Sequence, residues 1–191
     1  GMDKRIGSKF LHPGPGFGGS CFPKDVRALS ALARQARYEM KLTDAVLEVN
    51  KHQTASVINR IKRVVPDLEG RTIAVLGLSF KPDTDDMREA PALKIISDLL
   101  EAGARVRAYD PAAMEPARAI LKDVTYCEDE YDAASESEAL VVVTEWNQFR
   151  SLDLDKLKSV MSKLNIVDLR NIYEPEAIRA AGFKYVSMGR L

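Results

Sequence analysis

The sequence predicts an α/β fold in which a helical segment precedes a parallel β-sheet of about six strands. From residue 71 onward, short apolar runs alternate with amphipathic stretches that are long enough to form helices. Strands separated by helices in this way form βαβ units, and such strands are parallel. The 191 residues suffice for one domain of this kind and a helical appendage. The second part of the chain is therefore expected to be Rossmann-like, with a doubly wound sheet.

The first part of the chain divides into an extended segment and a helical region. Residues 1–22 are extended and glycine-rich, and they include the candidate site loop. Residues 23–69 carry apolar positions at helical spacing, with a break near residues 38–42. Thr43 and Asp44 follow this break, and we expect them to cap a second helix. Two helices of this length need a partner surface that buries their apolar stripe.

The remaining residues, 70–191, are expected to form the α/β domain. The strand-like runs are residues 72–76, 105–109, 124–126, 140–144, 165–168 and 184–187. The amphipathic stretches between them are residues 91–102, 114–121, 154–164 and 175–181. In a doubly wound sheet the ligand lies outside the carboxyl ends of the strands, so residues that follow strands are the candidates for a site.

Composition excludes several classes of function. The chain holds 28 Lys and Arg residues and 28 Asp and Glu residues, so its formal net charge is zero. This balance predicts no nucleic-acid partner and no binding to an anionic membrane surface. No apolar run approaches the roughly 20 residues that span a bilayer, and no signal peptide is visible. Two cysteines in different contexts make no disulfide framework, so the cytoplasm is the expected location.

The strongest chemical signal is a cysteine between a glycine-rich loop and the start of a helix. Cys21 follows the loop, and Pro23 suits the first turn of a helix. The positive end of the helix dipole and the nearby Lys24 favour a thiolate at this position. Asp25 lies one helical turn beyond the thiol. These features favour a nucleophile, although a cysteine is more often a small buried hydrophobe; Cys127, which ends a short strand-like run, fits that second description.

The first strand-to-helix turn of the α/β domain lacks a dinucleotide fingerprint. A G-x-G-x-x-G motif is expected there in a dinucleotide site, and only Gly77 is present. Asp110, after the second strand, either holds a ribose hydroxyl or serves as a turn residue before a proline. Lys81 and Arg170 also follow strands, where each either meets a phosphorylated ligand or forms a surface ion pair. The domain is therefore expected to bind something other than a whole dinucleotide.

No metal site is expected. The two histidines lie far apart in the sequence, which excludes the ligand spacing of a zinc site. The acidic loop at residues 83–89 is more simply explained by solvation or by ion pairs with Lys81 and Arg88 than by a hard cation, which needs several converging oxygen ligands.

Four ordered motifs resemble the nucleotide-sugar dehydrogenases of the UDP-glucose/GDP-mannose dehydrogenase family. The motifs are residues 16–25, residues 5–7, residues 77–81 together with 85–89, and the Thr-Glu-Trp at 144–146. The resemblance covers essentially the whole chain. It implies a four-electron oxidation of UDP-glucose to UDP-glucuronate that uses two NAD⁺. It also implies that the family's NAD-binding N-terminal domain lies outside these residues, and that the helices at 23–69 mediate a homodimer.

The same resemblance assigns roles to individual residues. Cys21 matches the nucleophile that forms a thioester, and Asp25 matches an aspartate that positions or deprotonates water. Arg88 matches a residue that reaches NAD. The residues that match substrate contacts are Arg5 (toward a neighbouring subunit), His12, Gly14, Gly16, Phe17, Gly18, Gly19, Ser20, Phe80, Lys81 and Arg170. Two alternatives remain open, namely a dehydrogenase for UDP-N-acetylmannosamine or GDP-mannose, and a non-catalytic dimerisation or nucleotide-binding module.

Overall fold

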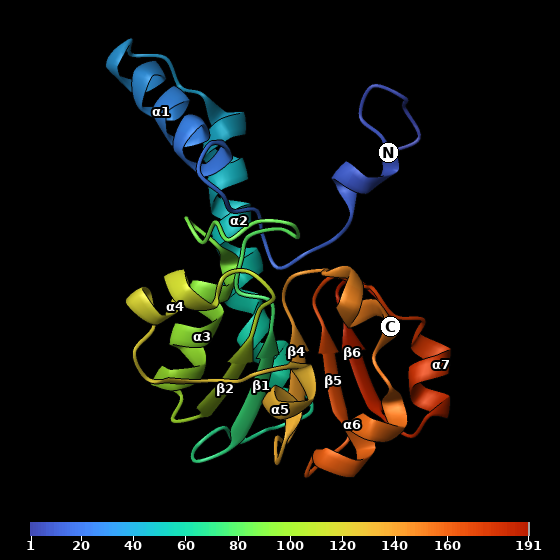
Figure 1. Cartoon of the computed structure of the whole chain (residues 1–191). Coiled ribbons are helices and arrows are strands. Elements are labelled where there is room, and N and C mark those ends of the chain that lie inside the picture. The colour runs from blue at the N-terminus through green and yellow to red at the C-terminus, as the bar shows by residue number, and fades with distance from the viewer. Residues whose placement is uncertain (191) are drawn as a thin grey trace.

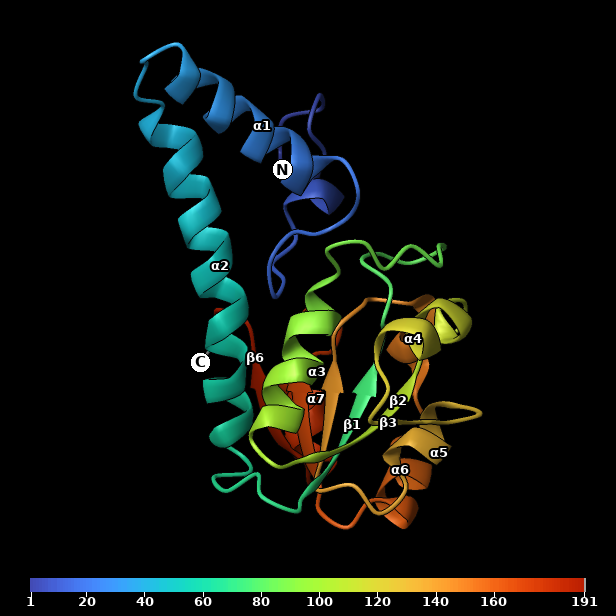
Figure 2. The ribbon, with the colours of Figure 1, turned by 90° about the vertical axis from the view of Figure 1, so that its left-hand side faces the viewer.

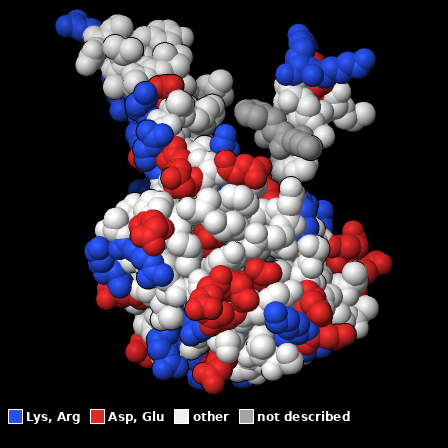
Figure 3. Space-filling model, in the orientation of Figure 1, with Lys and Arg blue, Asp and Glu red and all other residues white. Residues whose placement is uncertain are grey.

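The structure, a computed structural model, describes residues 1–190 apart from the side chains of Lys9 and Phe10. Its main body is an α/β domain, from which a pair of helices projects as an arm (Figure 1). Seen from the side, the arm rises well beyond the sheet, and the N-terminal segment lies near the carboxyl end of the strands (Figure 2). Both signs of charge are spread over the arm and the domain on the face shown in Figure 3.

The sheet has six parallel strands in the order β3-β2-β1-β4-β5-β6. The strands are β1 (Thr72–Leu76), β2 (Arg105–Tyr109), β3 (Val124–Tyr126), β4 (Ala139–Val142), β5 (Asn165–Asp168) and β6 (Lys184–Ser187). Chain order reverses direction between β1 and β4, which pair with Ile73 opposite Ala139. This is the doubly wound order, so the predicted fold class is confirmed, and ligands are expected in the crevice above this reversal point.

Helices cover both faces of the sheet because successive strand residues point to opposite sides. Ile73 and Val75 pack with the apolar faces of α2, α3 and α4, whereas Ala74 and Leu76 pack with α5, α6 and α7. The domain helices are α3 (Pro91–Glu101), α4 (Met114–Ile120), α5 (Glu130–Ala134), α6 (Leu154–Val160) and α7 (Pro175–Ala180). The β1 and β4 strands are almost wholly apolar and buried, as expected for parallel strands covered on both faces.

The arm consists of α1 (Phe22–Gln35) and α2 (Lys41–Lys62), which are in contact near the turn that joins them and diverge from it in an inverted V (Figure 2). The last turns of α2 anchor the arm, because Val57 and Ile61 are fully buried in the domain core. No described helix is both long and apolar enough to cross a membrane.

The predicted cap of α2 is wrong. The helix begins at Lys41 with Met40 at the N-cap and no capping side chain. Asp44 instead accepts hydrogen bonds from Ser30 and from the Arg34 guanidinium, and these bonds join α1 to α2. The Ser30 bond, with the Arg34 charge, lowers the pKa of Asp44. Asp44 therefore forms a tertiary contact between two helices, although its residue type and position in the sequence are typical of a helix cap.

Several element boundaries also differ from those predicted. The fourth strand ends at Val142 rather than residue 144, and α6 ends at Val160 rather than residue 164. Three short elements were not predicted: α5 and the 3₁₀ helices η1 (Ser8–Leu11) and η2 (Asn147–Ser151). The sequence did contain a signal for α5, because aspartate is a favoured N-cap residue and Asp129 stands directly before this helix. In the structure its side chain accepts hydrogen bonds from the N–H groups of Tyr131 and Asp132.

Candidate functional site

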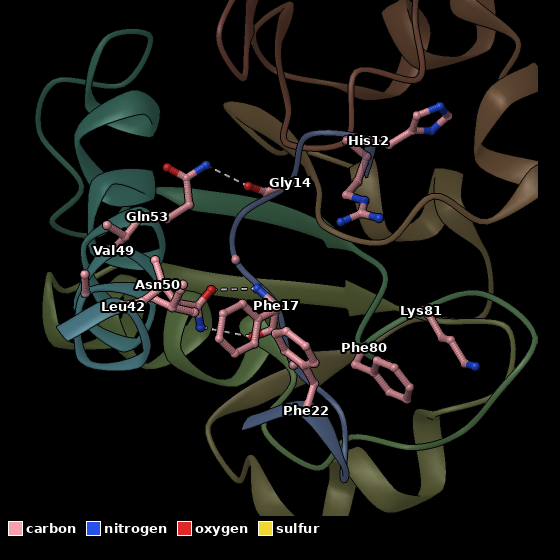
Figure 4. A pocket seen from close by; sticks show the side chains of 15 residues that line it. His12, Gly14, Phe17, Phe22, Leu42, Val49, Asn50, Gln53, Phe80 and Lys81 are labelled. Atoms are coloured by element: carbon pink, nitrogen blue, oxygen red, sulfur yellow. Dashed lines mark hydrogen bonds between the residues drawn. The ribbon is translucent and has the colours of Figure 1, made fainter. Parts of the chain in front are cut away.

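A cavity of about 790 Å³ lies between the helical arm and the carboxyl ends of the central strands. Its lining includes the cationic side chains of Lys81 and Arg170 together with His12. Figure 4 shows Phe17, Phe22, Leu42 and Val49 gathered at the α2 end of the cavity, with Phe80 and Lys81 at the opposite end. The apolar lining comes from Phe17, Phe22, Phe80, Leu42, Ala45, Val46 and Val49, and the remaining lining residues are Gly14, Gly16, Gly18, Asn50 and Gln53. The cavity therefore occupies the position where doubly wound sheets bind ligands.

The glycine-rich loop runs through this cavity because its neighbours leave room for backbone alone. A Cβ atom built at Gly14 would lie 2.2 Å from Arg170 Nη1. A Cβ at Gly18 would lie 2.2 Å from the carbonyl oxygen of Glu89. Both distances are far below a van der Waals contact, so a larger residue at either position would displace a site residue. The N–H groups of Gly16 and Gly18 donate no hydrogen bond to any residue that the structure describes.

Three side chains of α2 hold this loop, and sequence reasoning missed all of them. Asn50 Oδ1 accepts from the N–H of Phe17 at 2.7 Å, and Asn50 Nδ2 donates to the Phe17 carbonyl at 3.2 Å. Gln53 donates to the Gly14 carbonyl at 2.8 Å, and Thr54 donates to the Pro15 carbonyl at 2.8 Å. Polar residues at this spacing share one face of a helix, which was the available signal.

Arg170 enters the cavity from the turn after β5. Its Nη2 atom donates to Glu145 Oε1 at 2.5 Å, and Asp168 Oδ1 accepts from its backbone N–H at 2.9 Å. Within the described residues, Arg170 Nε and Glu145 Oε2 are buried without a hydrogen-bond partner. Arg170 therefore forms an ion pair and also lines the cavity, and its contact with a phosphorylated ligand stays a prediction. The Lys81 ammonium lies 5.3 Å from the centre of the Phe80 ring.

Cys21 opens into a second, adjoining recess of about 650 Å³. The residue is exposed and occupies the N-cap position of α1. The recess is lined by Ser20, Cys21, Lys24, Arg27, Arg88 and Glu89. Asp25 lies one residue beyond Lys24 and pairs with it at 3.5 Å. The structure thus divides the predicted residues between two neighbouring cavities that share the loop.

The loop before α3 borders the Cys21 recess. Arg88 pairs with Asp86 at 2.8 Å, and the hydrogen bond between them lowers the pKa of the Asp86 carboxyl and raises the pKa of the Arg88 guanidinium. Arg27 of α1 pairs with Glu89 at 2.7 Å, and Gly19 donates to the Arg88 carbonyl at 2.9 Å. Among the described residues no three His, Cys, Asp or Glu side chains are grouped so that they could hold a metal ion.

Asp110 has a structural role rather than the ligand contact that was one of its two predicted roles. It is only 1% exposed, and its two carboxylate oxygens accept six hydrogen bonds. The donors are the N–H groups of Leu78, Ser79, Ala112 and Ala113, the Ser79 hydroxyl and the Trp146 indole. Because these bonds use the carboxylate fully, the turn after β1 does not fit the ribose of a bound dinucleotide.

The remaining predicted residues lie apart from these cavities or at their edge. Arg5 pairs with Asp3 of its own segment at 2.7 Å, and its side chain is 88% exposed. His12 is exposed where it lines the cavity. Cys127 is buried as predicted, and burial raises the pKa of its thiol to about 11. This second cysteine therefore stays protonated at neutral pH.

The fold and the two cavities define a doubly wound α/β domain with an attached helical arm and a cysteine between the two. Residues 74–175 match the UDP-binding domain of the UDP-glucose/GDP-mannose dehydrogenase family, and residues 1–52 match its central domain. The chain belongs to the UDP-glucose/GDP-mannose dehydrogenase family.

Individual relatives agree with this assignment. The chain is 48% identical to the UDP-glucose 6-dehydrogenase of Rhizobium meliloti and 46% identical to UDP-glucose 6-dehydrogenase TuaD of Bacillus subtilis. The alignments cover all of this chain but only 44% and 41% of those proteins. A solved UDP-glucose dehydrogenase from Pyrobaculum islandicum superposes with a TM-score of 0.82 at 39% identity over 99% of this chain and 41% of that one.

An NDP-N-acetyl-D-galactosaminuronic acid dehydrogenase from Methanosarcina mazei also superposes with a TM-score of 0.82. It is 28% identical, and the superposition covers 94% of this chain and 40% of that one. The chain thus spans less than half the length of the relatives that it matches.

Proposed function

We propose that this chain is the nucleotide-sugar-binding part of an NAD-dependent UDP-glucose 6-dehydrogenase. The observation that carries the proposal is the junction of two cavities on one glycine-rich loop. One cavity offers Lys81 and Arg170 at the carboxyl ends of the strands, and the other presents an exposed cysteine at a helix N-terminus. Such a pair of cavities suits a ligand with a diphosphate at one end and a reacting carbon at the other.

The larger cavity supplies the chemistry that a UDP group requires. Lys81 and Arg170 provide positive charge for the diphosphate, and the free N–H groups of Gly16 and Gly18 provide further donors. Phe17 and Phe80 offer ring faces beside these donors. Glu145 holds the Arg170 guanidinium through its Nη2 atom, so Arg170 need not reorganise when the ligand arrives.

Cys21 supplies the covalent step at the sugar. After the C6 alcohol has been oxidised to the aldehyde, the Cys21 thiolate adds to the carbonyl carbon and forms a thiohemiacetal. Loss of the carbon-bound hydrogen as hydride, with loss of the hydroxyl proton, yields a thioester. Water then adds to the thioester carbon and the thiolate leaves, which releases the carboxylate and regenerates Cys21. Asp25 is proposed to orient or deprotonate this water.

The hydrides need an acceptor, which is proposed to be two NAD⁺, each of which takes one hydride when bound. Overall, one alcohol and one water become one carboxylate, two hydrides and three protons. The turn after β1 does not fit a dinucleotide, because Asp110 is fully used and only Gly77 of the glycine motif is present. The acceptor is therefore proposed to lie mainly on residues outside this chain, with Arg88 reaching toward it from the Cys21 recess.

UDP-glucose is proposed over other nucleotide sugars because the sequence of this chain is more similar to UDP-glucose 6-dehydrogenases than to a dehydrogenase named for another sugar. The two UDP-glucose 6-dehydrogenases are 46–48% identical to this chain, whereas the N-acetylgalactosaminuronate dehydrogenase is 28% identical. The cationic groups of the cavity do not distinguish these sugars, because every candidate carries the same diphosphate. A panel of nucleotide sugars, assayed with the complete enzyme, tests this choice.

The isolated 191-residue chain is expected to bind UDP and UDP-glucose but to reduce no NAD. Binding follows from the cavity that the chain carries, and the lack of turnover follows from the absent dinucleotide site. Calorimetric titration with UDP measures the first expectation, and a spectrophotometric assay for NADH measures the second. NADH formation by the purified chain with UDP-glucose would refute the assignment of the NAD site to other residues.

A matched pair of lysine variants locates the binding. Lys81→Met is expected to weaken UDP binding about tenfold through loss of one charge-assisted contact. Lys62→Met changes an exposed lysine at the end of α2 and is expected to leave the affinity unchanged. Equal affinities of the two variants would remove Lys81 from the site.

The arm is proposed to pair with a second copy of the chain. Leu29 and Leu32 of α1 are 46% and 61% exposed, although they recur at helical spacing, and neither lines the two cavities. Leu32→Glu is expected to shift a dimer to a monomer in sedimentation velocity, because a charge at this surface opposes apolar contact. Ile120→Glu, on the distant α4, is the control and should leave the sedimentation unchanged. A wild-type chain that sediments as a monomer would contradict the proposal.

A further inference from the structure

We propose that Asn50, Gln53 and Thr54 are positioning residues, which hold the loop at residues 14–17 in the shape that binds the nucleotide sugar. We call these three side chains the α2 bracket. The inference rests on the proposed function, because it names residues that shape that same site without supplying charge or a nucleophile to it. None of the three carries a charge, so their spacing on one face of α2 is the signal that the sequence offers for them.

The α2 bracket engages the loop at almost every residue. Its hydrogen bonds take up the carbonyls of Gly14 and Pro15 and both the N–H and the carbonyl of Phe17. Asn50 makes two of these bonds with a single side-chain amide, so it fixes the orientation of the Phe17 peptide groups as well as their position. Figure 4 shows Asn50 and Gln53 reaching from α2 to the loop at Phe17 and Gly14.

The α2 bracket also leaves the N–H of Gly16 free to donate a hydrogen bond to a ligand. The N–H of Gly16 makes no hydrogen bond within the described part of the chain, whereas its neighbours are held by α2. Gly16 has φ = 122°, and a Cβ there would lie 2.7 Å from Thr54 Oγ1 and 2.9 Å from Asn50 Oδ1. The bracket and the glycine therefore fit together, because only a residue without a side chain lets α2 approach the backbone so closely.

A glycine-rich loop needs such support more than other loops do. Glycine has the largest conformational freedom to lose, so an unsupported loop would have to be ordered when the ligand binds, at the expense of affinity. The α2 helix is a rigid base for this purpose, since Val57 and Ile61, about one and two turns beyond Thr54, are fully buried in the domain core. On its other side the loop meets Arg170 at Gly14, so its position also determines the space left beside that guanidinium.

The test combines UDP titration with amide hydrogen exchange on the chain as it stands. Asn50→Leu removes both Phe17 bonds at nearly constant size, and we expect about tenfold weaker UDP binding and at least about tenfold faster exchange of the Phe17 amide. Thr54→Val removes the Pro15 bond and should weaken UDP binding less, whereas Thr54→Ser keeps the hydroxyl and should bind as the wild type does. Asn59→Leu, at an exposed position on the same helix, is the matched control and should change neither quantity.

The outcomes separate the two proposals. Failure of the wild-type chain to bind UDP would overturn the proposed function. Binding by the wild type with unchanged affinity in both Asn50→Leu and Thr54→Val would overturn the positioning role. Equal exchange of the Phe17 amide in wild type and Asn50→Leu would overturn it as well. Because Thr54→Val and Thr54→Ser differ by one hydroxyl, they decide the matter even if Asn50→Leu does not fold.

Discussion

Replacement of Cys21 by alanine in the complete enzyme is expected to abolish formation of the uronic acid and to leave UDP binding nearly intact. The thiol lies in the recess beside the loop, whereas the groups proposed to hold the diphosphate line the larger cavity. Loss of a catalytic nucleophile commonly costs about four orders of magnitude or more in rate. Without the thioester, oxidation should stop at the aldehyde, so NADH per sugar should fall from two to at most one.

Product analysis by mass spectrometry, together with the NADH yield, measures this expectation. Cys127→Ala is the matched control: it removes the other thiol, which is buried with its pKa raised to about 11 and cannot serve as a thiolate at neutral pH. The control should retain acid formation, apart from a modest loss of stability from the smaller core residue. Undiminished acid production by Cys21→Ala would remove Cys21 from the nucleophile role.

Replacement of Asp110 by alanine is expected to destabilise the fold by about 4 kcal/mol or more, because several buried donors would lose their acceptor at once. These donors lie after β1, after β2 and on Trp146, so the carboxylate joins three separate segments at the carboxyl edge of the sheet. Equilibrium unfolding in urea, with wild type and variant side by side, measures the change in the free energy of unfolding.

Asn at the same position should rescue little of this loss. Oδ1 accepts from two N–H groups and Oδ2 from four donors, so an amide nitrogen would face a donor in either orientation. Asp123→Ala, at an exposed position with no described partner, should change the free energy of unfolding by less than about 0.5 kcal/mol. An Asp110→Ala variant as stable as Asp123→Ala would show that the network carries little of the stability.

Most of the fold could be predicted because its strands carry a local signal. Buried parallel strands such as β1 and β4 read as short apolar runs, and the helices between them show a helical period, so class and strand number follow from the sequence. The errors lie where a local pattern competes with a tertiary contact. Asp44 looks like a cap and is used to join two helices, and α5 is too short to show a period.

The candidate site was predictable only for residues with conspicuous chemistry. Cys21 and the glycine loop stand out in the sequence, and the loop does line the larger cavity. The sequence contains no sign that Cys21 opens into a separate recess, or that Arg170 is paired with Glu145, 25 residues away. The sequence also leaves the role of Asp110 open, since an aspartate that stabilises a turn and an aspartate that binds a ribose hydroxyl both stand directly after a strand.

The sequence by itself therefore determined the α/β class, the order of strands and helices along the chain, and the family to which its motifs belong. These properties depend on apolar periodicity and on short motifs, both of which are local in the chain. Only the tertiary structure decided the order of strands in the sheet, the division of the site into two cavities and the role of α2 in holding the loop. Hydrogen bonds such as Asn50 to Phe17 join residues 33 positions apart, and contacts at such separation arise from packing that no local pattern encodes.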